Sequence, residues 1–138
     1  MAGEGGYELV GFAVPAELDR VHALLERVGQ DHPHIAPMDL MLFETAVVEI
    51  ANNVVEHGRP EGEVRWRFVV RVGEDAIEAD LLDTGQEFAA EMHIGMPDEE
   101  AEGGRGLALA EAVLDEFTWE RTDQGNCWRM VRRLGQGG

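Results

Sequence analysis

Three polar side chains near the middle of the chain repeat at four-residue intervals: Glu49, Asn53 and His57. A helix advances about 100° per residue, so positions four apart lie on nearly the same face. An apolar stripe recurs beside them at helical spacing, at Phe43, Val47, Ile50 and Val54. The pattern predicts a long helix with a polar row at the edge of its core-facing side.

These residue types are suited to phosphoryl transfer. The amide oxygen of Asn53 is an appropriate ligand for Mg²⁺, which prefers oxygen ligands. Glu49, one turn earlier, could orient or deprotonate a hydroxyl nucleophile, because this chemistry depends on positioning and charge stabilisation. His57 could either contact a phosphate or cap the helix end. Alone, such a row is more often the solvated side of a helix.

Two later segments strengthen this interpretation. Asp83 and Gly85 end a predicted strand, where the carboxylate could accept a hydrogen bond from an exocyclic amine and the glycine would let a flat ring approach the backbone. A glycine-rich segment then opens a helix and offers free N–H groups to phosphate oxygens, with Arg105 as a forked donor. Its residues are Gly103, Gly104, Arg105 and Gly106.

The elements that must position these residues can be read from periodicity and from helix and turn signals. The polar row lies on a helix from about Asp39, as N-cap, to His57, with Gly58 ending it in a left-handed conformation. A shorter helix is predicted from Pro15 to about Gly29, and a third from Gly103. Strands are expected at 7–14, 64–72, 76–82, 117–121 and 127–134. This order predicts a mixed, largely antiparallel sheet covered on one face by three helices, an α+β two-layer sandwich.

Size and charge limit the classes of function. The chain has 138 residues, 44% of them hydrophobic, which fits a single domain over 1–138 with its core at about 7–134. A net charge of −17 makes direct binding of nucleic acid or of an anionic membrane improbable. The lone Cys127, and the absence of a leader or long apolar run, predict a soluble protein of the cytoplasm.

The ordered motifs resemble the conserved boxes of the GHKL ATPase and kinase superfamily. They are Glu49-x-x-x-Asn53-x-x-x-His57, Asp83-x-Gly85-x-x-Phe88 and Gly103-Gly104-Arg105-Gly106-Leu107. The chain looks most like the anti-sigma factor serine kinases of the SpoIIAB and RsbW type. The resemblance extends over roughly residues 13–134.

That resemblance implies the Bergerat fold, which binds ATP and Mg²⁺, with an ATP lid at about 86–103. By the family pattern Asp83 and Gly85 would meet the adenine, Asn53 the metal, and Glu49 would be the general base. The segment Gly104 to Leu107 would border the phosphates, and Gly103 and His57 are counted with the residues that bind the nucleotide. The family often carries a threonine near the adenine in the last strand, and by this resemblance Cys127 occupies that place, as a weaker hydrogen-bond partner.

The resemblance further implies a serine kinase that phosphorylates a STAS-domain anti-anti-sigma partner and regulates a sigma factor. Such proteins often form homodimers, which makes a homodimer a possible state of this chain. One alternative is a non-catalytic or weakly ATP-binding module that only captures its partners. A less favoured alternative is the catalytic domain of a histidine kinase.

Overall fold

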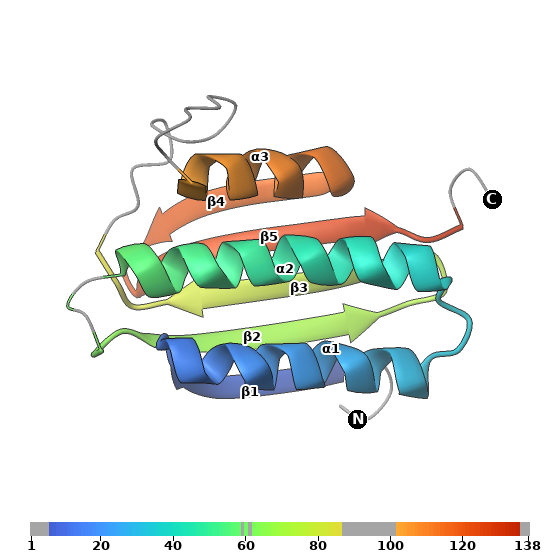
Figure 1. Ribbon diagram of the computed structural model, residues 1–138, viewed down its shortest axis with the longest axis horizontal. Coiled ribbons are helices and arrows are strands. Elements are labelled where there is room, and N and C mark those ends of the chain that lie inside the picture. Colours follow the sequence, from blue (N-terminus) through green and yellow to red (C-terminus); the bar gives the residue numbers. More distant parts are fainter. Residues whose placement is uncertain (1–5, 59, 61, 87–101, 136–138) are drawn as a thin grey trace.

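The computed structural model describes residues 6–58, 60, 62–86 and 102–135. Within this part, one five-stranded antiparallel sheet in the order β1-β2-β3-β5-β4 has three helices packed on one face (Figure 1). In chain order the elements are β1 (Gly6–Phe12), a 3-10 turn (Pro15–Glu17), α1 (Leu18–Asp31), α2 (Pro37–His57), β2 (Arg65–Val72), β3 (Ala76–Asp83), α3 (Glu102–Val113), β4 (Glu116–Thr122) and β5 (Gly125–Arg133). The predicted α+β two-layer sandwich is confirmed.

The start of α2 differs from the prediction. The helix begins at Pro37 rather than at an Asp39 cap, because proline suits the first turn, where its missing N–H is not needed. Asp39 is instead buried, and its Oδ1 accepts hydrogen bonds from Nε and Nη2 of Arg132 at 3.0 and 2.8 Å. Arg132 Nη1 also donates to the carbonyl oxygen of Val113 at 2.6 Å. This ion pair ties α2 to β5 and to the end of α3.

The end of α2 also differs. Gly58 has φ −68° and ψ 134°, so the predicted left-handed conformation is wrong. The glycine is needed for space rather than for a positive φ. A Cβ at this position would lie 2.7 Å from the carbonyl oxygen of Val54 and 3.2 Å from Cγ2 of Val64. Gly58 therefore leaves the helix in an extended conformation and lies close to Val64, the residue before β2.

Strand alternation places the site residues. The side chains of β3 that face the helices are Ile77, Ala79, Leu81 and Asp83, all of them buried. Their counterparts on β5 are Asn126, Trp128 and Met130, which pair with Asp83, Leu81 and Ala79. Asp83 is thus the last member of an apolar row, and it brings a carboxylate to the end of the core.

The opposite face of the sheet carries charges of both signs. Its arginines are Arg65, Arg67, Arg71, Arg129 and Arg133, and its acids are Glu8, Glu78, Asp80, Glu116 and Glu120. Arg71 and Arg129 both contact Glu78 and Asp80, at 2.7 to 3.4 Å. Positive and negative side chains are therefore balanced on this face.

Candidate functional site

Asn53 lies on the core-facing side of α2 and is only 2% exposed. Its Oδ1 and Nδ2 are both buried, and neither has a hydrogen-bond partner among the described residues. Leaving a buried polar group unpaired costs about 1–3 kcal/mol. Among the described residues, the other buried side-chain atom without a hydrogen-bond partner is Nε1 of Trp66. Trp66 on β2 pairs with Asp83 on β3. The amide of Asn53 is thus positioned for a partner that the described residues do not supply.

Glu49 and His57 differ from Asn53 in their surroundings. Glu49 is partly buried, and its carboxylate has no hydrogen bond or ion pair with another described residue. His57 is the last residue of α2, and its imidazole is 44% exposed, with Nε2 3.9 Å from Oε1 of Glu56. Its carbonyl oxygen accepts a hydrogen bond from Nε2 of Gln86 at 3.1 Å. The helix therefore presents, one turn apart, a carboxylate and an amide that have no hydrogen-bond partner among the described residues.

Asp83 has a dense set of donors. Its Oδ1 accepts hydrogen bonds from the backbone N–H of Gly85 and from Nδ2 of Asn126, and its Oδ2 accepts one from Nε1 of Trp128, each at 2.9 Å. The residue is 2% exposed. A buried carboxylate needs such donors, because an unpaired charge in the core is costly.

The β4–β5 hairpin also fixes the turn that follows Asp83. Arg121 Nη1 donates to the carbonyl oxygen of Gly85 at 2.8 Å, and Asn126 Nδ2 donates to that of Gln86, also at 2.8 Å. Trp119 Nε1 donates to Oδ1 of Asn126 at 3.2 Å. The sequence-based site missed Asn126 and Trp128. Their alternation with Met130 on the last strand was a usable signal, but only together with the pairing of that strand to β3.

Gly85 plays a different part from the one expected. A Cβ there would lie 3.1 Å from Oδ1 of Asp83 and 3.4 Å from Cγ2 of Val64, so the chain's own atoms already occupy that space. The glycine lets the backbone fold closely around the Asp83 carboxylate and donate its N–H to it. The approach of a flat ring to the Gly85 backbone stays a prediction.

Cys127 does not face the site. It pairs with Leu82 on β3 and Glu120 on β4, and it lies between Asn126 and Trp128, which both point toward the helices. Since neighbouring strand residues point to opposite faces, the Cys127 thiol lies on the open face of the sheet. The prediction that Cys127 contacts the nucleotide is wrong, because Asn126 is the last-strand residue that meets Asp83.

The position of Cys127 on the open face predicts how its thiol reacts with a maleimide. Burial, followed by the nearby carboxylates of Asp80 and Glu120, raises the pKa of the thiol. Because the thiolate is the reactive form, labelling by a maleimide at pH 7 should be slower than for free cysteine. Saturating ATP and Mg²⁺ should leave that labelling rate unchanged. Protection of Cys127 by nucleotide, measured by mass spectrometry, would contradict the assignment to the open face.

The glycine-rich segment lies at the start of α3. The helix begins at Glu102, so Gly103, Gly104, Arg105 and Gly106 form its first turns, while Leu107 is fully buried in the core. The side chains of 102–106 lie outside the described residues, as do Phe88 and most of the predicted lid, 87–101. The roles expected of Arg105 and of the lid therefore stay predictions.

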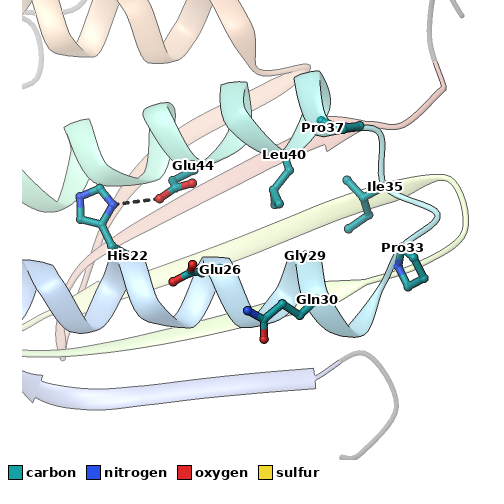
Figure 2. A pocket seen from close by; sticks show the side chains of 9 residues that line it. All are labelled: His22, Glu26, Gly29, Gln30, Pro33, Ile35, Pro37, Leu40 and Glu44. Carbon is teal, nitrogen blue, oxygen red and sulfur yellow. Dashed lines mark hydrogen bonds and ion pairs between the residues drawn. The ribbon is translucent and has the colours of Figure 1, made fainter.

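A groove of about 740 Å³ lies elsewhere, between α1 and α2 (Figure 2). Its lining includes His22 and Glu44, whose Nδ1 and Oε2 are 2.8 Å apart and bridge the two helices. Leu40 and Ile35 supply part of its apolar wall. None of the predicted site residues lines it, so we assign this groove no role at the Asp83 site.

Comparison with known proteins agrees with the geometry. No described helix combines the length and the apolar character needed to cross a membrane. A search of curated proteins finds no match. The family model for the histidine kinase-like ATPase domain matches residues 13–132, which include α2, Asp83, α3, β4 and β5 up to Arg132. The chain therefore belongs to the family of histidine kinase-like ATPase domains, within the GHKL superfamily, and this membership implies ATP binding.

Proposed function

We propose that this protein is an ATP-dependent serine kinase and anti-sigma factor, which phosphorylates a STAS-domain anti-anti-sigma partner and regulates a sigma factor. Family membership supports the nucleotide and the class of chemistry. The serine acceptor and the partner proteins come from the motif resemblance to SpoIIAB and RsbW. A homodimer belongs to the same proposal.

The unpaired amide of Asn53 is the observation that carries this proposal. A buried side chain with two unsatisfied polar atoms lowers stability, and strain of this kind collects at functional sites. Mg²⁺ keeps several waters and binds through few protein oxygens when it also holds phosphates. The described residues contain no cluster of three or more acidic, histidine or cysteine side chains that could hold a metal ion. Asn53 Oδ1 therefore fits an ion whose other ligands are phosphate and water.

The remaining roles follow from position on the helix. The serine oxygen would bond to the γ-phosphorus as the bond to the β–γ bridging oxygen breaks, and ADP would leave. Glu49, partly buried and without a hydrogen bond or ion pair to another described residue, would accept the serine proton. Asp83 would receive the base, with one acceptor position left on its carboxylate. Backbone N–H groups of the α3 start would contact the phosphates.

Asn53→Ala tests the metal end of the site. We expect the Kd for ATP–Mg²⁺, measured by calorimetry, to rise by about tenfold or more, since a ligand to a cation is lost. The same change should keep or raise the melting temperature, because it removes a buried amide that has no partner.

Asn52→Ala is the matched control for this measurement. Asn52 is the neighbouring amide on α2, and its Nδ2 already donates to Oε2 of Glu56 at 3.1 Å. Its loss should change the Kd by no more than about twofold. If Asn53→Ala binds ATP–Mg²⁺ as tightly as the wild type does, Asn53 is not a ligand of the bound nucleotide complex.

A second candidate function is a binding module that captures a sigma factor without turnover. The hydrogen bonds that Asn126 and Trp128 donate to the Asp83 carboxylate favour this candidate, because these donors compete with the base of an incoming nucleotide. This candidate predicts that sigma-factor binding, measured by pull-down and calorimetry, is the same for wild type and Asn53→Ala. Transfer of phosphate to a STAS-domain protein would count against it.

A further inference from the structure

The Asp83 carboxylate is held mainly by its own chain, and one of its donors is an indole. Gly85 and Asn126 both donate to Oδ1, while Trp128 donates to Oδ2. A carboxylate offers about four lone-pair positions. The three donors occupy two lone-pair positions on Oδ1 and one on Oδ2. The remaining position is therefore on Oδ2, the atom that accepts the hydrogen bond from Trp128.

Trp128 is fixed in this orientation by its neighbours. It is 1% exposed, and its ring lies nearly parallel to that of Phe117, with centroids 6.4 Å apart and planes at 11°. Trp119 packs at a tilt of 56° with the same centroid separation. A well-packed aromatic cluster resists rotation of one member, because the other rings lose their contacts. The indole N–H therefore stays directed at Asp83.

We propose that Trp128 sets the affinity and base preference of the nucleotide site by competing with the ligand for Oδ2 of Asp83. The inference rests on the proposed function, since it takes Asp83 as the acceptor for the base. A base with an exocyclic amine must share Oδ2 with the indole or displace it. Trp128→Phe keeps an aromatic ring against Phe117 but has no donor, so the variant leaves Oδ2 free for the ligand.

Calorimetry on the full chain tests this competition. Trp128→Phe should lower the Kd for ATP–Mg²⁺ by about tenfold or more, the value of a hydrogen bond to a charged group. For the triphosphate of unsubstituted purine riboside, which lacks the 6-amino group, Trp128→Phe should increase the affinity by no more than about twofold. An equal gain for both ligands would show that Trp128 acts through its size alone, which overturns the proposal.

Trp119→Phe is the matched control. It removes an indole N–H from the same aromatic cluster, but that N–H donates to the amide oxygen of Asn126 and not to the carboxylate. We expect its Kd for ATP–Mg²⁺ to stay within about twofold of wild type. A gain as large as that of Trp128→Phe would assign the effect to general loosening of the hairpin and overturn the proposal.

The outcomes separate this inference from the proposed function. Tighter binding by Trp128→Phe, or binding by that variant alone, supports the competition. If the wild type binds ATP–Mg²⁺ and the variant binds it no better, the competition is wrong and the nucleotide site stands. If neither the wild type nor Trp128→Phe binds ATP–Mg²⁺, the assignment of the nucleotide site is wrong, and so is the proposed competition. Trp128→Leu, which also lacks a donor, replaces the phenylalanine variant if that protein does not fold.

A measurement on the wild type gives an independent readout. In ¹⁵N-indole spectra, saturating ATP–Mg²⁺ should shift the Nε1–H resonance of Trp128 and slow or speed its hydrogen exchange, because its acceptor is shared or lost. Bound nucleotide with an unmoved Trp128 signal would overturn the proposal.

Discussion

Glu49→Gln is expected to reduce phosphate transfer to a serine of the STAS-domain partner by about 10²- to 10⁴-fold, the usual contribution of a general base. Glutamine keeps the size and polarity of the side chain but cannot accept the serine proton. The Kd for ATP–Mg²⁺ should stay within about twofold, because the metal and base contacts are assigned to other residues. Transfer of radiolabelled phosphate under single-turnover conditions measures the chemical step, with the Kd from calorimetry alongside.

Glu44→Gln is the matched control for that experiment. Glu44 lies on the same helix five residues earlier, but its carboxylate is engaged by His22 on α1. Its loss should leave transfer unchanged. Full transfer by Glu49→Gln would remove Glu49 from the mechanism. Label that is acid-labile and attached to a histidine of the partner would instead support a histidine kinase.

Gly125→Ala should have the largest effect on stability. Gly125 begins β5 with φ +139°, a conformation that residues with a Cβ rarely adopt. A Cβ there would lie 1.9 Å from the carbonyl oxygen of Asp83 and 2.9 Å from its carbonyl carbon. Since backbone atoms of a central strand cannot move aside cheaply, we expect a loss of at least about 4 kcal/mol in the free energy of unfolding. Urea denaturation followed by circular dichroism measures it.

Gly62→Ala separates the clash from the backbone strain. Gly62 also has a positive φ, +80°, but among the described residues beyond its chain neighbours no atom lies within 4 Å of its Cβ position. Its substitution should cost only about 1 kcal/mol, the ordinary cost of a left-handed conformation for a residue with a side chain. If the two variants lose equal stability, close packing of Gly125 on Asp83 is not what fixes the hairpin.

Local patterns were sufficient for much of this fold. The apolar stripe of α2 predicted burial correctly, since Phe43, Val47, Ile50 and Val54 all lie in the core. The period of two in β2 likewise predicted which side chains face the helices. These patterns succeed because helix and strand periodicity act over a few residues, and hydrophobic burial selects the face.

Features that depend on distant partners were not predictable in this way. Asp39 has the residue type of a helix cap, but it is buried, and its ion-pair partner Arg132 lies 93 residues later. Trp128 and Asn126 reach Asp83 only through the pairing of β3 with β5, which a single sequence does not specify. The face on which Cys127 lies depends on the same pairing, since a shift of one residue in a strand reverses its side chains.

The balanced charges on the open sheet face have a consequence for molecular encounters. Because opposite charges cancel on that face, much of the excess negative charge of the described residues lies on the helix layer. There α1 and α2 carry two arginines, Arg20 and Arg27, and six acidic side chains: Asp19, Glu26, Asp31, Glu44, Glu49 and Glu56. The resulting field points across the thickness of the molecule. It orients an approaching cationic protein toward the helices during diffusion, and dissolved salt weakens this steering within a Debye length.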